Sequence, residues 1–90
     1  MPTYLASIDV MLKPLVNDPQ GLAVLDGLQN LGFAGAHRVR VGKHIEVTID
    51  ATDRPAAEAA VTDMCRQLLA NPVIEDFRFD LAAVDVPAAT

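Results

Sequence analysis

Two arginines that alternate along a short apolar segment are the residues of this sequence best suited to binding chemistry. Arg38 and Arg40 flank Val39, so an extended strand would place both guanidinium groups on one face. Such a pair can hold an anion, as in a small domain that hydrolyses acyl phosphates. That kind of domain also needs a glycine-rich loop after its first strand, where this chain has Lys13-Pro14-Leu15-Val16. We therefore favour salt bridges, within the chain or to a partner, over a phosphate site.

The other chemically competent side chains show no spacing typical of a catalytic or metal site. His37 and His44 have no set of cysteines or carboxylates around them that completes a metal-binding pattern, so we interpret them as exposed or interface histidines. Cys65 lies on the apolar face of a predicted helix, where a thiol is buried and inert. Gly42-Lys43 lacks the rest of a phosphate-binding loop and indicates a turn. The sequence predicts no catalytic, cofactor-binding or metal-binding residue in this chain.

Acidic residues are scattered rather than paired for acid–base catalysis. Helix caps and solvated strand edges explain most of them: Asp50, Asp53, Glu75, Asp76 and Asp80.

The composition of the chain excludes several classes of protein. Its 90 residues include 7 basic and 12 acidic side chains, a net charge of −5, which argues against a nucleic-acid or membrane-surface binder. The length allows one domain with a thin core, for which help from an oligomer is expected. One cysteine cannot form an internal disulfide. No apolar run reaches the ~20 residues of a membrane span, and the first residues lack a basic leader pattern, so we expect a soluble, cytoplasmic protein.

Hydrophobic periodicity divides the chain into six elements and a tail. It predicts strands over 3–13, 38–41, 45–50 and 73–81, and helices over 19–31 and 54–70. Asp18 is the predicted cap of the first helix, and Gly32 lies where a left-handed residue ends it. Leu68 belongs to the predicted buried face of the second helix. A three-residue loop at 42–44 keeps the valines and isoleucines of the two middle strands on one face, so we predict a hairpin there.

This order predicts an α+β fold, a single βαββαβ domain of ferredoxin-like topology over residues 1–81, with a flexible tail over 82–90. Two helices are expected on one face of an antiparallel sheet. On the opposite face, Leu5 and Met11 stand among polar neighbours. A semi-apolar open face on so small a domain favours use of a sheet face or edge for dimerisation.

Four stretches, in order along the chain, resemble PurS, the small subunit of bacterial and archaeal phosphoribosylformylglycinamidine synthase. They are Asn17-Asp18-Pro19-Gln20-Gly21, Leu31-Gly32-Phe33, Val39 to Lys43 continued by Ile45 to Asp50, and Met64-Cys65 followed by Leu68 to Phe77. The resemblance covers nearly the whole chain except its end. Ala82 to Thr90 has no counterpart, and His37, Arg38 and His44 stand at positions expected to vary.

The resemblance implies a non-catalytic adaptor in the fourth step of de novo purine synthesis. In that step the glutaminase PurQ releases ammonia, and the synthetase PurL uses ATP and Mg²⁺ to form the amidine. The resemblance also implies that the chain has no cofactor of its own, that it forms dimers or higher homo-oligomers, and that it bridges PurQ and PurL. A closed assembly would keep ammonia unprotonated and near the second site.

Three groups of residues that match the family are carried over as a partner-interface hypothesis. They are the helix start, the predicted hairpin and the corner before the last strand: Asp18, Pro19, Gln20 and Gly21; Arg40, Gly42, Lys43 and Glu46; Asn71, Pro72, Glu75 and Asp76. Capping explains Asp18 and Pro19, but it explains neither Gln20 nor Gly21, and glycine near a helix start is mildly unfavourable.

Two functions from other classes remain open at this point. One is a regulatory βαββαβ domain that binds a small molecule at a dimer interface. The other is a small enzyme that uses Arg38 or Arg40 on a phosphate.

Overall fold

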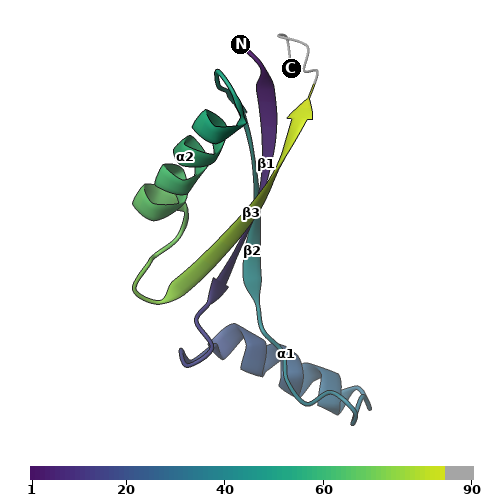
Figure 1. The fold of residues 1–90 in the computed structure, drawn as a ribbon. Helices are drawn as coiled ribbons and strands as arrows, with labels where there is room; N and C mark the ends of the chain where they lie inside the picture. Colours follow the sequence, from purple (N-terminus) through teal and green to yellow (C-terminus); the bar gives the residue numbers. More distant parts are fainter. Residues whose placement is uncertain (85–90) are drawn as a thin grey trace.

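A three-stranded antiparallel sheet forms the centre of the part of the chain that the structure, a computed structural model, describes, residues 1–84 (Figure 1). Strand β1 (Thr3–Leu12) lies between β2 (Gly42–Asp50) and β3 (Glu75–Val84). Ile8 pairs with Ile45 on one side and with Phe79 on the other. The α+β class and the antiparallel sheet are confirmed.

The core lies on one face of this sheet. Alternation along β1 places Tyr4, Ala6, Ile8 and Val10 on that face, and all four are buried. Because β1 is the central strand, the side chains on its core face are flanked by those of β2 and β3. The period-two alternation in the sequence predicts which side chains of β1 share this face.

Helix α2 (Arg54–Met64) covers this face (Figure 1). Asp53 caps the helix by accepting a hydrogen bond from the Ala56 N–H at 2.9 Å. Ala57 and Val61 are fully buried, one helical turn apart. The cap and the apolar spacing therefore act together to fix which side of α2 meets the sheet.

The predicted burial of Leu68 is wrong, because the second helix does not stay α-helical to its end. From Cys65 to Leu69 it continues as a π-helix, η1, closed by a hydrogen bond from the Ala70 N–H to the Cys65 carbonyl at 2.9 Å. A π-turn adds a residue and rotates the side chains that follow. Cys65 stays buried, whereas Leu68 is 83% exposed.

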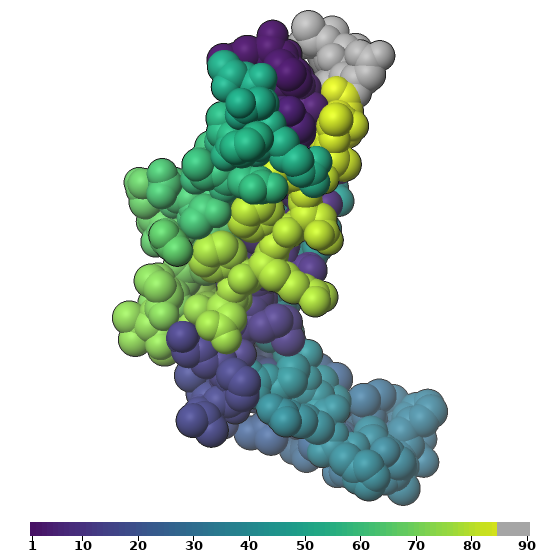
Figure 2. Space-filling model, in the orientation of Figure 1, coloured from purple at the N-terminus to yellow at the C-terminus, as the bar shows by residue number. Residues whose placement is uncertain are grey.

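Helix α1 (Pro19–Asn30) extends beyond the end of the sheet instead of lying on it, contrary to the prediction of two helices on one face (Figures 1 and 2). Only Gly21 of α1 is buried, and Leu22 is 56% exposed. The pairing of β1 with β2 ends at Met11 and Gly42, so the segments that lead to and from α1 lie past the last paired residues. The radius of gyration, 17.1 Å, exceeds the about 12 Å of a compact chain of this length.

The predicted hairpin at 42–44 is also wrong. Gly42 to Asp50 forms one strand, and residues 37–41 precede it without strand structure. A loop of three residues and an uninterrupted strand keep the same odd-numbered positions on one face, so the alternation of valine and isoleucine is compatible with both. The hydrogen bonds of Arg40 and Val41, described below, hold this segment against the end of β1.

One helix is too narrow to cover the whole core face of the sheet. Side chains of the two edge strands on that face remain half-buried: Ile45, Val47, Ile49, Phe77 and Phe79. The single chain thus leaves apolar surface on both the sheet and α1. The predicted tail overlaps the end of β3, which continues to Val84, and the remainder of that tail lies outside the described residues.

Shortening a buried side chain of α2 should destabilise the fold, whereas shortening Leu68 should not. We expect Val61→Ala to lower the free energy of unfolding by about 2 kcal/mol, because Val61 is fully buried against the sheet. Leu68→Ala should leave it nearly unchanged. Urea unfolding of both variants checks this, and equal losses would mean that the helix continues in α-helical phase.

Candidate functional site

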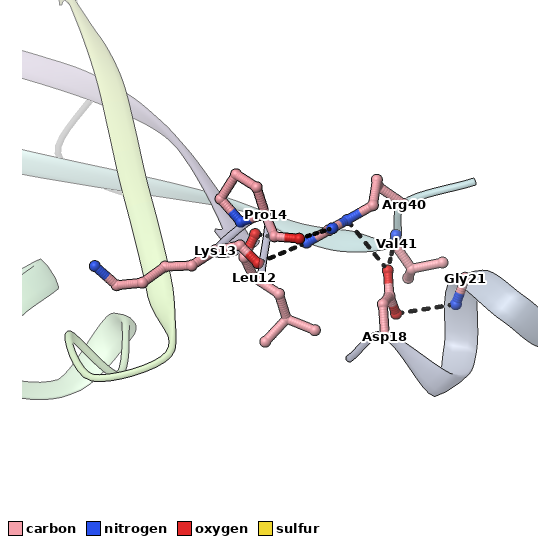
Figure 3. A network of polar contacts seen from close by, with 7 residues as sticks. All are labelled: Leu12, Lys13, Pro14, Asp18, Gly21, Arg40 and Val41. Atoms are coloured by element: carbon pink, nitrogen blue, oxygen red, sulfur yellow. Dashed lines mark hydrogen bonds and ion pairs between the residues drawn. The ribbon is translucent and has the colours of Figure 1, made fainter. Parts of the chain in front are cut away.

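The first candidate group meets around one buried carboxylate, that of Asp18, which is 8% exposed (Figure 3). Its Oδ1 accepts a hydrogen bond from the Gly21 N–H at 2.9 Å, which caps α1. Its Oδ2 accepts one from the Val41 N–H at 3.0 Å, and the Arg40 Nε lies 3.6 Å from the same oxygen. Asp18 thereby ties the start of α1 to the segment that enters β2.

Arg40 completes this junction from the other side (Figure 3). Its Nη2 donates to the carbonyl oxygens of Leu12 at 2.7 Å and Lys13 at 3.1 Å, and its Nη1 donates to that of Pro14 at 3.2 Å. These carbonyls belong to the last residue of β1 and the two residues that follow it. The guanidinium group is therefore committed to the fold and does not stand ready for a phosphate.

Close packing explains why residue 21 is a glycine, which helix capping alone did not explain. A Cβ at this position would overlap the Val39 carbonyl oxygen and would lie 2.6 Å from the Asp18 Oδ2. Only glycine permits this approach of the helix to the returning chain. Gln20, next to it, is exposed and lines a small groove between α1 and the sheet.

The environment of Asp18 favours its ionised form. The Val41 and Gly21 backbone N–H groups, and then the Arg40 charge, hold the pKa of the Asp18 carboxyl below its usual value, against the effect of desolvation. A carboxylate with a lowered pKa in the folded state stabilises that state above the unfolded pKa, near 3.9, and this contribution is lost as pH falls through the folded pKa.

The second candidate group is spread along the start of β2. Gly42 packs so closely against Met11 that a Cβ would overlap the Met11 Sδ, so this glycine serves strand packing and not a turn. Lys43 reaches across the sheet, and its Nζ lies 3.9 Å from a carboxylate oxygen of Glu75. Glu46 is exposed and faces His44, with 3.4 Å between Oε2 and Nε2.

The third candidate group forms a rigid turn before β3. The Asn71 Oδ1 accepts from the Val73 N–H at 3.1 Å, and the Asn71 N–H donates to the Glu75 Oε1 at 2.7 Å. Pro72 stands at the exposed tip of this turn. Asp76 pairs with Lys13, 3.3 Å from Nζ to Oδ1. The twelve candidate residues thus lie in three places, and several of them have clear roles within the chain.

A charged cluster that the sequence analysis did not identify lies on the open face of the sheet. The His44 Nδ1 is 2.8 Å from the Asp9 Oδ1, and the Arg78 Nε is 3.5 Å from the Asp9 Oδ2. Asp9 is paired directly with His44 on β2 and with Arg78 on β3. A register of strands, which the sequence does not display, was needed to find this cluster.

The cluster shifts the titration of two of its members. Hydrogen bonds that the carboxylates of Asp9 and then Glu46 accept from its ring raise the pKa of His44, and the hydrogen bond with His44 is the main cause that lowers the pKa of Asp9. Because the pKa of His44 is raised, its contribution to stability is present below about pH 6.5 and lost as pH rises through the folded pKa. These side chains are largely exposed, so solvent screens the effect.

Neither a metal centre nor a membrane span is found in the described part of the chain. No three His, Cys, Asp or Glu side chains among residues 1–84 are placed to hold a metal ion. No helix in the same range is long and apolar enough to cross a membrane. Cys65 is buried, and burial raises the pKa of its thiol, as in an inert core cysteine.

Comparisons with known proteins agree on one family. The model of the family PurS, described as phosphoribosylformylglycinamidine (FGAM) synthase, matches residues 5–83. The PurS subunit of the same synthase from Synechocystis is 47% identical over 83 residues, 92% of this chain and 83% of that protein. The Bacillus subtilis subunit is 42% identical over 81 residues, 90% of this chain and 95% of its own.

Solved structures give the same result. Bacillus subtilis PurS superposes with a TM-score of 0.80 at 42% identity, covering 88% of this chain and 98% of that one. A chain from the structure of PurLQS from Thermotoga maritima gives a TM-score of 0.81 at 28% identity, covering 93% and 100%. The similarity therefore includes the projecting α1 arm as well as the sheet.

Removing the charge of Asp18 should lower stability at neutral pH and matter little in acid. We expect Asp18→Asn to reduce the melting temperature at pH 7, because two backbone N–H groups and Arg40 lose an ionised acceptor. As pH falls through the folded pKa of Asp18, the wild-type carboxyl becomes protonated, so the difference in melting temperature between the two proteins should shrink toward acid pH. Thermal unfolding between pH 2 and 7 measures this difference.

Asp26→Asn is the matched control, since Asp26 is an exposed aspartate of the same helix. It should leave the melting temperature unchanged across the range. A melting difference for Asp18→Asn that is equally large at pH 2 and 7 would show that the charge of Asp18 is not what holds the junction.

Proposed function

The chain belongs to the PurS family of phosphoribosylformylglycinamidine synthase subunits, and from this membership we propose that it is the non-catalytic adaptor that bridges the glutaminase PurQ and the synthetase PurL. The observation that carries the proposal is the match, over the full length of that chain, to a chain of the Thermotoga PurLQS structure. Similarity of this extent favours an adaptor over a regulatory module that binds a small molecule.

In this proposal the chemistry belongs to the partners. PurQ releases ammonia from glutamine, and PurL uses ATP and Mg²⁺ to convert formylglycinamide ribonucleotide into its amidine in the cytoplasm. Free ammonia would become ammonium in water at neutral pH and would diffuse away. An adaptor that holds the two active sites in one assembly raises the effective concentration of ammonia at the second site, and it needs no catalytic group for that.

A second copy of the chain is the partner that best fits α1. An isolated helix of 12 residues is marginal in water, and in the single chain α1 buries only Gly21. Its apolar stripe includes Val24, 45% exposed, and Leu31, 76% exposed. The core face of the sheet has half-buried apolar positions beside α2, on the two edge strands. By two-fold symmetry, the α1 of each copy can cover the free part of the other copy's sheet, which satisfies both surfaces at once.

Reconstitution tests the adaptor function. PurL and PurQ from the same organism should form the amidine from glutamine only when this chain is added, because separate subunits lose ammonia to solvent. With ammonium salt as nitrogen donor, PurL should work without the chain. Amidine formation by coupled assay measures both reactions, and glutamine-dependent activity that is indifferent to the chain would refute the adaptor.

Charges placed on the apolar side of α1 should dissociate the proposed dimer. The double variant Val24→Glu, Leu31→Glu should elute and scatter light as a monomer, because the buried stripe of the interface cannot accept two carboxylates. The control, Ala23→Glu, Asn30→Glu, adds the same charge about 100° around the helix from Val24 and Leu31 and should remain dimeric. Equal masses for both variants would exclude α1 from the interface.

A further inference from the structure

The open face of the sheet, which lies opposite the face that α2 covers, carries its side chains in rows that cross the three strands. Alternation places the odd-numbered residues of β1 on this face, and the strand pairing sets one residue of β2 and one of β3 beside each of them. Two outer rows are centred on Leu5 and on Met11. Between them lie two inner rows, which are Glu46, Ser7 and Asp80, and then His44, Asp9 and Arg78.

The two inner rows differ in charge. One of them has two acids, Glu46 and Asp80, and no cation. The other has the cation Arg78 and also His44, whose pKa is raised, with the single acid Asp9 between them. The Arg78 side chain is 86% exposed and its Nε lies 3.5 Å from Asp9, so most of the guanidinium group faces solvent. Asp80 forms no ion pair among residues 1–84, so both rows have charge available to a partner.

The two outer rows differ in shape. Because Gly42 has no side chain, the Met11 side chain lies over it, and a groove of about 530 Å³ opens at this end of the face. His44 and Arg78 are among the other residues that line the groove. The outer row at the opposite end has a side chain on every strand, with the half-buried Leu5 at its centre. One end of the open face is therefore hollowed, whereas the other end presents a partly exposed leucine.

These differences make the open face complementary to itself. The complement is reached by a two-fold axis that runs parallel to the rows, midway between the two inner ones. A second copy turned about this axis places Asp80 of each copy opposite Arg78 of the other, and Glu46 opposite His44, across two sheets packed face to face. The same rotation places Leu5 of each copy over the groove of the other. Acid therefore meets cation, and apolar side chain meets hollow, twice in one contact.

We propose that the open face docks the open face of a second copy, so that dimers joined through α1 pair into tetramers. The contact uses the side of the sheet opposite to the one that α1 would cover, so both contacts can form in one assembly. Each copy contributes four rows of three residues, fewer than the about 20 to 30 residues a side of a stable interface. We therefore expect dimers in dilute solution and tetramers as the concentration rises. The inference goes beyond the adaptor function and does not depend on it.

Sedimentation equilibrium of the full chain at rising protein concentration tests the contact. The mass of the wild type should rise from that of a dimer to that of a tetramer, and added salt should favour the dimer, because the charges are exposed. The variants Asp80→Arg and Arg78→Asp each set like charges opposite one another. Either variant alone should raise the dissociation constant of dimer pairing at least tenfold. A mixture of the two should pair like the wild type, because each charge then meets its opposite.

Matched controls make the same charge changes away from the open face. Asp63→Arg changes an exposed aspartate of α2, and Arg66→Asp changes an exposed arginine of η1. Both controls should pair as the wild type does. Thermal unfolding of all four variants checks that each is folded, and the mixture of the two open-face variants distinguishes a lost contact from a damaged fold, because only folded chains can restore pairing.

Three results would overturn the inference. One is a wild type that stays a dimer at the highest concentration, and another is pairing in Asp80→Arg and Arg78→Asp that equals that of the wild type. The third is an open face occupied by a different subunit, which would appear as weaker binding of both variants to PurL or PurQ without any change in the mass of the chain alone. Failure of the wild type to support glutamine-dependent activity would overturn the adaptor function and leave this contact standing.

Discussion

The buried carboxylate of Asp18, with the guanidinium of Arg40 beside it, is the constraint on which the shape of this molecule depends. Four segments meet there: the end of β1, the start of α1, the chain that returns from α1 and the entry into β2. A carboxylate that accepts from backbone N–H groups and an arginine that donates to backbone carbonyls satisfy polar groups where β1, α1 and β2 end or begin. Because both ends of the α1 arm are fixed at this junction, the arm is directed away from its own sheet.

That direction explains why so small a chain carries so much apolar surface. The sheet is covered by one helix, and the other helix has almost nothing to bury within the chain. Such an arrangement is costly for a monomer, since a domain of this size already buries little surface. It suits a subunit whose partners supply the missing half of the core. The polar side chains described above agree with this role, because they stabilise turns and strand ends and do not converge on a substrate site.

The resemblance to the PurS family, visible in four short stretches, was confirmed by comparisons over most of the chain. The role of particular residues was harder to predict. Asp18 and Gly21 were selected as partner contacts, yet the structure gives both a reason within the chain, and the same holds for Arg40. The sequence alone does not distinguish residues that maintain an unusual junction from residues that contact a partner. Leu15 and Val73, which the structure exposes, had no pattern that distinguished them from core leucine and valine.

By itself, the sequence determined the central strand, the starts of both helices and their caps. Period-two alternation along β1, aspartates before proline-containing helix starts and Gly32 at φ +99° after α1 are local features, and local physics suffices to predict them. Only the tertiary structure decided how those elements meet. Apolar residues at odd-numbered positions from Val39 to Ile49 are compatible with a hairpin and with one long strand. Likewise, an apolar stripe on a helix does not show whether the helix packs on its own sheet or on that of another chain. The projection of α1 and the junction at Asp18 arise from contacts between distant segments, whose geometry no local pattern contains.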